Sequence, residues 1–396
     1  MRNVRLSTSC KASAGRHVSV RKEERDGYLR RANAPGGGRR THSRRSGACK
    51  ESPRRVPSFR IYVSPEYHSD AFLATPGQLD YRAAFPGPDG SYQTDSVLEV
   101  ASLTKLITAI AALQLIEKNQ ISLEQDVSSY IPAFADQPIL TGFTEKGSPI
   151  TRPRRNQITL ERLLTHTAGG GYPFTDERLN HYVQNNNNRK DGTVAATFDF
   201  PLSYEPGESW KYSNSMDRLG QIVEKLSGQT LDEYFQEHIF RPLGISQASF
   251  WNLSHPPMAV RTTPNGPAVP DPTTPSFTTG LSECFGGQGV LMNLEDFMKI
   301  LHSLLTDDGT LLKSETVAEL FRPRLSHSTK DGLLKELEHP SWAVGDLPPT
   351  REYNWAIGGL VIDGDSHPYR RRNTVLWSGA PSCFWVRLIQ LLSHAD

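Results

Sequence analysis

The chain has 396 residues, of which 37% are hydrophobic and 22% are charged. This composition permits one large or two ordinary globular domains and excludes collagen-like and coiled-coil designs. The net charge of +1 conceals an asymmetry, because residues 1–57 carry 16 Lys and Arg against 4 Asp and Glu, whereas the rest of the chain carries 28 against 39. A basic segment therefore precedes an acidic body.

Two further features of the composition bear on the compartment. No apolar run reaches the roughly 18 residues that a membrane helix needs. The four cysteines are widely separated and form no CxxC pair; they are Cys10, Cys49, Cys284 and Cys383. This spacing indicates neither a zinc site nor a disulfide framework. We therefore expect a cytoplasmic protein with no membrane partner, and the sequence leaves the oligomeric state open.

Residues 1–57 are predicted to be a disordered basic arm, because they contain too few apolar residues to offset the entropy of ordering. No apolar segment follows the first arginines, which argues against a secretory signal. A mitochondrial transit peptide and a nucleic-acid-binding arm are alternatives to a solvated tail. The nucleic-acid alternative is disfavoured, since the arm lacks interleaved aromatic residues and any reading module.

Residues 58–396 are predicted to form one domain. The patterns of apolar and turn residues predict strands at 59–63 and 79–85, helices at 103–113, 216–226, 230–241 and 294–305, and late strands at 356–362 and 374–377. Strands, helices and strands again, in this order, indicate an α+β fold: an antiparallel sheet flanked by helices, with a helical insertion. Residues 126–280 form the helical, loop-rich lobe, and its loops at 132–206 and 256–280 are candidate walls of a site.

Common catalytic and nucleotide-binding motifs are missing from the sequence. It contains no GxSxG elbow, no HExxH, no HxH pair and no Walker loop, and its glycine clusters at 169–171 and 286–289 do not fit GxGxxG. This argues against an α/β-hydrolase, a zinc hydrolase and a nucleotide-dependent enzyme. We expect neither a metal nor a cofactor.

One reactive pattern remains, Ser102-Leu103-Thr104-Lys105, at the start of the strongest predicted helix. A serine and a lysine three residues apart share a helix face, and the helix N-terminus adds a partial positive charge beside the serine. A serine hydroxyl needs a base to become a good nucleophile. SxxK alone is a weak signal, because Ser19-Val20-Arg21-Lys22 in the basic arm also matches it.

Two later segments could complete a site. Tyr212-Ser213-Asn214 directly precedes a predicted helix, where it could equally be an ordinary helix start with a packed tyrosine. Trp377-Ser378-Gly379-Ala380 lies at the end of a predicted strand, where a glycine lets a ligand approach the backbone. Taken alone, this segment is better explained as a strand end with a turn glycine.

Taken together, the three segments resemble the ordered motifs of the serine β-lactamases and penicillin-binding proteins. The tyrosine version is similar to the class C β-lactamase group, with its relatives the family VIII esterases and D-alanyl peptidases. Supporting landmarks, in chain order, are LLTHTAG at 163–169, PG at 206–207, RPLGI at 241–245 and GGQGV at 286–290. The resemblance covers residues 91–387.

The third segment resembles the WGG of the fungal lovastatin-type transesterases more than the KTG of penicillin-cleaving members. A Lys or Arg at this position would help to bind a β-lactam carboxylate, whereas Trp377 carries no charge. The resemblance therefore implies a serine acyl-enzyme hydrolase or transesterase that acts on an uncharged acyl ester or thioester. The resemblance to the fungal transesterases suggests a place in secondary metabolism.

The resemblance also implies roles for individual residues. Ser102 would be the acylated nucleophile, Tyr212 the general base and then acid, and Lys105 the group that holds the phenolate. The oxyanion would lie between the backbone amides of Ser102 and Ala380.

Substrate binding would involve the second and third segments. Asn214 would orient Lys105 or the acyl carbonyl, and Trp377 would wall the acyl pocket. Ser378, Gly379 and Ala380 would line the substrate-binding edge of the strand.

The ends of the chain depart from the family pattern. Only 17 residues follow Gly379, whereas similar proteins continue into a further strand and a long terminal helix, and the N-terminal helix that partners it is also missing. We therefore expect an uncovered sheet face and poor folding, as in a truncated product of a family gene. The alternative function is a catalytically silent homologue, either a binding protein or a decayed copy.

Overall fold

The computed structural model describes residues 55–63, 72–75, 78–81, 95–186, 191–251, 253–255, 259–261, 268–270, 272–273, 275–343, 347–381 and 383–391, all within one compact unit. Residues 1–54 of the expected disordered arm, and residues 82–85 of the second expected strand, lie outside the described residues. Arg55–Pro57 belong to the first strand. The described residues therefore include the last three residues of the predicted arm together with most of the predicted domain.

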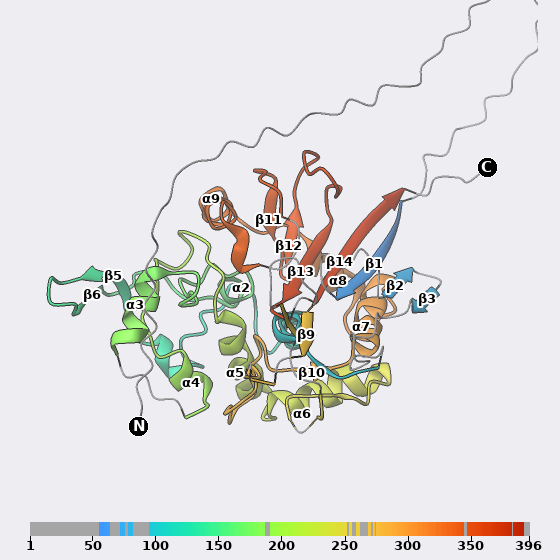
Figure 1. Ribbon diagram of the computed structural model, residues 1–396, viewed down its shortest axis with the longest axis horizontal. Helices are drawn as coiled ribbons and strands as arrows, with labels where there is room; N and C mark the ends of the chain where they lie inside the picture. The colour runs from blue at the N-terminus through green and yellow to red at the C-terminus, as the bar shows by residue number, and fades with distance from the viewer. Residues whose placement is uncertain are drawn as a thin grey trace, which may run out of the picture. The chain divides into compact units, whose positions relative to one another are not determined.

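A seven-stranded antiparallel sheet forms the centre of this unit, in the order β11-β12-β13-β14-β1-β2-β3. Its strands are β1 (Arg55–Val63), β2 (Phe72–Thr75), β3 (Gln78–Tyr81), β11 (Tyr353–Trp355), β12 (Leu360–Ile362), β13 (Val375–Gly379) and β14 (Cys383–Leu391). The earliest and latest described strands lie side by side, since β1 pairs with β14 along its whole length, from Arg55 opposite Leu391 to Val63 opposite Cys383 (Figure 1).

Three smaller sheets complete the strand inventory of the described residues. One has the order β4-β10-β7, and two are hairpins, β5 with β6 and β8 with β9. Their bounds are β4 (Leu98–Glu99), β5 (Ile139–Phe143), β6 (Pro149–Arg152), β7 (Ala248–Ser249), β8 (Ala259–Arg261), β9 (Ala268–Pro270) and β10 (Leu291–Met292). Strand β4 of the first of these sheets ends at Glu99, just before Ser102 and the start of the longest described helix.

The helices are α1 (Thr104–Glu117), α2 (Leu160–Leu164), α3 (Glu177–Asn185), α4 (Val194–Thr197), α5 (Ser215–Ser227), α6 (Leu231–Phe235), α7 (Leu294–Thr306), α8 (Ser314–Phe321) and α9 (His327–Glu336). Helix α7 packs against β1 and β2, and α1 packs against α5 and α6. None of the described helices combines the length and apolarity needed to cross a bilayer.

Helix α1 is the core of the unit. The apolar stripe predicted from Leu103 to Leu113 underestimates its burial, because every residue from Thr104 to Leu115 is buried. Ala109, Ala111 and Ala112 allow neighbouring elements to approach the helix on its remaining sides. The nucleophile candidate therefore begins a helix that is surrounded by packed side chains.

The α+β fold class is confirmed, and most predicted elements occur with small shifts. The helix predicted at 230–241 begins at the predicted place, where Thr230 and Glu233 form a capping box, but its α-helical part, α6, ends at Phe235 and is followed by a π turn over Gln236–Phe240. The predicted strand 356–362 is wrong in its first half, because Ala356 and Gly359 are hydrogen-bonded to each other in the turn between β11 and β12.

Two other expectations need correction. The region 132–206 is not only loop, since it contains β5, β6 and α2 to α4. The expected uncovered sheet face does not occur in β11, β12 or β13, because every side chain of these three strands is buried. The expected exposure of an apolar face therefore has no support in this half of the sheet.

Candidate active site

Ser102 lies in a 3₁₀ turn, Ala101–Leu103, that leads directly into α1. Its neighbour Ala101 has φ +43°, a conformation that is strained for a residue with a Cβ and that is often found at functional sites. Gly379, at the end of β13, lies against this turn: a Cβ at Gly379 would be 2.4 Å from the Val100 carbonyl oxygen. The absence of a side chain at Gly379 thus brings the first and third sequence motifs together.

The Ser102 hydroxyl receives two hydrogen bonds. The Tyr212 hydroxyl donates to Ser102 Oγ at 2.7 Å, and Lys105 Nζ donates at 3.2 Å. Tyr212 comes from the segment before α5, 110 residues further along the chain. The structure therefore brings together the three residues whose roles the sequence could only suggest.

Lys105 is buried, and its Nζ has three acceptors. They are Ser102 Oγ at 3.2 Å, Gly287 O at 2.7 Å and the Tyr172 hydroxyl at 3.4 Å. An ammonium has three donors and no acceptor, so this environment fits a charged lysine. Nζ also lies 4.7 Å from the centre of the Tyr212 ring, where a cation stabilises negative charge on that tyrosine.

Trp377 contacts Tyr212 through both its ring and its polar edge. Its indole Nε1 donates to the Tyr212 hydroxyl oxygen at 3.3 Å, and the two ring centres are 5.0 Å apart. The Tyr212 oxygen therefore lies between Ser102 and an indole N–H, with the Lys105 ammonium beside the ring. This arrangement suits a phenolate that takes the serine proton.

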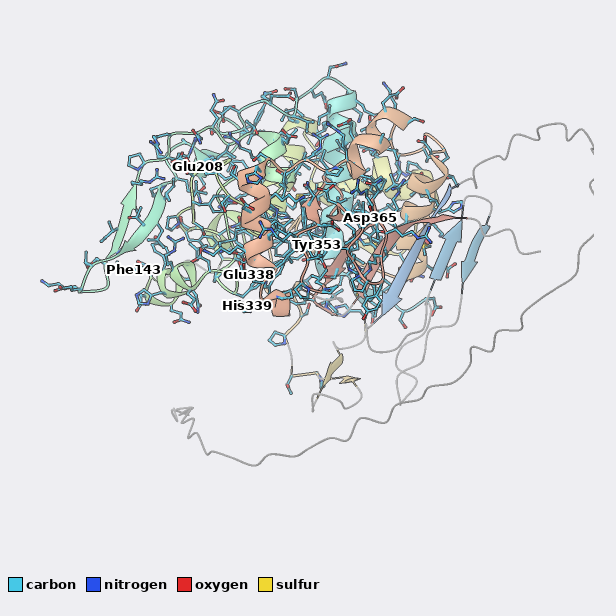
Figure 2. The ribbon with its side chains drawn as sticks, turned by 90° about the horizontal axis from the view of Figure 1, so that it is seen from above. Phe143, Glu208, Glu338, His339, Tyr353 and Asp365 are labelled. Carbon is cyan, nitrogen blue, oxygen red and sulfur yellow. The ribbon has the colours of Figure 1, made fainter. Side chains whose placement is uncertain are left out.

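A second tryptophan, which the sequence analysis did not single out, covers Tyr212. Trp342 stacks on the Tyr212 ring at 5.3 Å with an interplanar angle of 22°. It lies in the short turn Pro340–Trp342. Glu338 and His339, labelled in Figure 2, follow the end of α9 and lead into this turn. Because this turn follows a region with no recognisable motif, no signal in the sequence marks Trp342.

Tyr172 is a second phenol beside Lys105, and it too was missed. Its hydroxyl donates to Asp217 Oδ2 at 3.4 Å. Burial, followed by the charge of Asp217, raises the pKa of Tyr172 well above its usual value. Tyr172 therefore stays a neutral phenol near neutral pH. The one sequence feature that could have marked Tyr172 is its position directly after the glycine cluster at 169–171.

Phe174 stacks on Tyr172 with ring centres 5.0 Å apart and an interplanar angle of 15°, and 64% of its surface is exposed. A large exposed aromatic side chain beside this cluster offers an apolar surface to a ligand. No motif in the sequence marks Phe174, since a single aromatic residue in a loop carries no pattern.

His166, from the LLTHTAG segment, supports the Tyr212 segment from behind. Its Nδ1 is hydrogen-bonded to Ser213 Oγ at 3.0 Å, and its ring centre lies 5.0 Å from that of Tyr212. Burial, followed by the positive charge of Lys105, lowers the pKa of His166 well below 6.5. The histidine is therefore a neutral packing residue near neutral pH.

This burial predicts acid sensitivity of the fold. Below about pH 6.5 the unfolded chain takes up a proton at His166 that the folded chain refuses, so the free energy of unfolding falls by up to about 1.4 kcal/mol per pH unit. His166→Asn, which tolerates the positive φ of +58°, should flatten this dependence between pH 6.5 and 5 in urea unfolding. The exposed His339→Asn is the control, and equal pH slopes in parent and His166→Asn would contradict the prediction.

The remaining expected binding residues lie around this cluster. Asn214 is buried, and its Oδ1 is 3.2 Å from the position of a Cβ at Gly170, on the side of a small cavity that Leu202 and Arg218 also line. Among the described residues no hydrogen bond joins Asn214 to Lys105. Ser378 is buried in β13, and Ala380 is exposed directly after it.

The searched part of the chain holds no group of His, Cys, Asp or Glu side chains arranged to bind a metal ion. The described fold and the cluster of serine, lysine and tyrosine are typical of serine enzymes of the hydrolase and acyltransferase type. The chain belongs to the beta-lactamase family, whose model matches residues 71–388. The resemblance inferred from the motifs is thereby confirmed.

Similar proteins include fungal esterases and acyltransferases. The chain is 36% identical over 318 residues to the lovastatin esterase of Penicillium rubens, covering 77% of this chain and 79% of that protein. It is 32% identical over 307 residues to the monacolin J acid methylbutanoyltransferase of Aspergillus terreus, covering 74% of each. A solved variant of simvastatin synthase from Aspergillus terreus superposes with a TM-score of 0.67 at 28% identity, covering 84% of this chain and 86% of that one.

Proposed function

We propose that this protein is a serine esterase or acyltransferase that takes an uncharged acyl group onto Ser102 and passes it to water or to an alcohol. The observation that carries the proposal is the 2.7 Å hydrogen bond between Tyr212 and Ser102, bracketed by Lys105 and by the indole N–H of Trp377. A nucleophile, a base and the groups that stabilise the base are thus in contact.

In the acylation step, the Tyr212 phenolate takes the proton of Ser102 while Oγ bonds to the acyl carbon. The backbone N–H groups of Ser102 and Ala380 donate hydrogen bonds to the carbonyl oxygen, on which negative charge develops. When the tetrahedral intermediate collapses, the leaving alcohol or thiol takes the proton from Tyr212. The Lys105 ammonium and the Trp377 indole favour the phenolate form that the cycle needs at its start.

In the deacylation step, the protons move in the reverse order. Water or an acceptor alcohol gives its proton to Tyr212 and attacks the acyl-enzyme, and Ser102 recovers its proton when the new ester or acid leaves. The apolar ring surfaces of Trp342 and Phe174 flank the two tyrosines beside Lys105. They favour an acceptor with an apolar body, which would displace water from the acyl-enzyme.

Charge supports an uncharged acyl donor. The three donors of Lys105 are already directed at protein acceptors, and Trp377 stands where a cationic third-motif residue would meet a carboxylate. The printed names of two relatives describe an esterase and a methylbutanoyltransferase. A short acyl group such as a branched butanoyl group, held as an ester or thioester, is the substrate class that these observations support.

Intact-mass measurement after mixing the protein with p-nitrophenyl butyrate tests this function. The parent should gain one butyryl group, and Ser102→Ala should gain none. Ser19→Ala is the matched control, because Ser19 begins the other SxxK sequence of the chain and should be labelled like the parent. A parent that gains no mass, or equal labelling of Ser102→Ala, would contradict the proposal and favour the catalytically silent homologue.

A further inference from the structure

Asp217 is a fully buried carboxylate in the first turn of α5, five residues after Tyr212. It contacts neither Ser102 nor Tyr212 in the described structure, and no Lys or Arg nitrogen of the described residues lies within 4 Å of its oxygens. Burying a carboxylate costs free energy unless other groups compensate for the charge. The hydrogen-bond partners of Asp217 therefore indicate its role.

Two hydrogen bonds reach this carboxylate. The Gly287 N–H donates to Oδ1 at 2.8 Å, and the Tyr172 hydroxyl donates to Oδ2 at 3.4 Å. The same two residues accept hydrogen bonds from Lys105 Nζ, through Gly287 O at 2.7 Å and the Tyr172 hydroxyl at 3.4 Å. Apart from the nucleophile, each protein acceptor of the ammonium is thus held by Asp217.

The backbone at Gly287 is shaped to let the carboxylate approach. A Cβ at this position would lie 2.4 Å from Asp217 Oδ2 and 2.8 Å from Cγ. Gly287 does not adopt a positive φ, so the need for glycine here is one of space and not of conformation. The preceding residue, Gly286, is also held by a short hydrogen bond, which Thr108 of α1 donates to its carbonyl at 2.6 Å. The peptide group between Gly286 and Gly287 is therefore held by Thr108 of α1 and by Asp217 of α5, directly before the carbonyl that accepts from Lys105.

Several polar groups act on Lys105 from the surrounding elements. Tyr172 and Tyr212 face it with their rings, and His166 interacts with it through its charge. Burial raises the pKa of Asp217, and the charge of Lys105, the Gly287 and Tyr172 hydrogen bonds and, last, the charge of Arg218 oppose that rise. Asp217 is thus the anion in this set, and residue Gly287 and the Tyr172 phenol link its carboxylate to the Lys105 ammonium.

We propose that Asp217 is a positioning residue for acyl transfer: through Gly287 and Tyr172 it holds the Lys105 ammonium at the Ser102–Tyr212 pair. This rests on the proposed function of the site. Asp217 has no hydrogen bond to a reacting atom, and it acts by fixing the direction of Lys105.

Asp217→Asn tests the proposal, because an amide can still accept from Gly287 but carries no charge. With p-nitrophenyl butyrate we expect kcat to fall about 10²-fold, as for a small misplacement of a catalytic group, while KM stays within about twofold. The pH profile of kcat should move to lower pH, because the site loses one negative charge. A purely structural role would not move that profile.

The control is Asp296→Asn, which removes another buried carboxylate near a helix start, one that accepts hydrogen bonds from Lys299 Nζ and from the side-chain amide of Asn293. Its kcat and pH profile should match those of the parent. A folded Asp217→Asn protein with parental kcat and parental pH profile would overturn the proposal. A parent that is not acylated at all would instead defeat the proposed function.

A second variant covers the case in which Asp217→Asn does not fold. Tyr172→Phe removes one of the two links and leaves the Gly287 link in place. Its kcat should fall by about tenfold, with little change in KM. Parental kcat in folded Tyr172→Phe would overturn the proposal in that case.

Discussion

Replacing Tyr212 by Phe is expected to lower kcat for p-nitrophenyl butyrate by about 10²–10⁴-fold with little change in KM. The variant loses the hydroxyl that contacts Ser102 at 2.7 Å and keeps the ring that packs on Trp342 and His166. The fold should therefore survive, and Ser102 should lose only the group that takes its proton. Steady-state kinetics with a thermal unfolding curve for each protein provide the measurement.

Tyr130→Phe serves as the comparison, because the Tyr130 hydroxyl accepts a hydrogen bond from Gln125 and contacts none of the catalytic candidates. It should keep the parental kcat. If Tyr212→Phe instead retained kcat within about fivefold of the parent, the base would have to be another group. Lys105, 3.2 Å from Ser102, would then be the remaining candidate.

Replacing Lys105 by Met should affect both activity and stability. Activity should fall by about 10³-fold, because the phenolate loses its cation. The free energy of unfolding should fall on the order of 3 kcal/mol, because the buried Asp217 carboxylate is left without its compensating charge. Met fills nearly the same volume, so a cavity contributes little to this loss. Urea unfolding of the folded protein measures the second effect.

The double variant Lys105→Met with Asp217→Asn separates the two effects. Removing the stranded carboxylate should recover most of the lost stability, whereas activity should remain as low as in Lys105→Met. Additive losses of stability in the double variant would show that the two charges do not compensate each other. Recovered activity would show that Lys105 is dispensable for the reaction.

The sequence allows much of the site to be predicted, because its main contacts come from short, ordered motifs. Ser102 and Lys105 share one turn of a helix, and that part of their geometry follows from spacing alone. The meeting of Ser102 with Tyr212 and Trp377 depends on how α1, α5 and β13 pack, and the expectation came from family resemblance. The structure brings these groups together, and their catalytic roles stay predictions.

What the sequence could not predict depends on packing between distant segments. Asp217 reads as one polar residue in an amphipathic helix, and nothing local shows that it faces Gly287, 70 residues later. The burial of α1 on all sides likewise depends on neighbours supplied by the rest of the chain. The turn at 356–359 was missed because Ala356 and Ile357 are as apolar as the strands beside them.

The pairing of β1 with β14 has a consequence for how the protein is made. These strands are more than 300 residues apart in the chain, and β14 is also the partner of β13, which carries Trp377 and Gly379. Contacts of such high sequence separation form slowly and late. During synthesis, the central sheet cannot be completed until the residues of β14 have emerged from the ribosome. Catalytic competence should therefore arise after translation reaches residue 391, in one late and cooperative step.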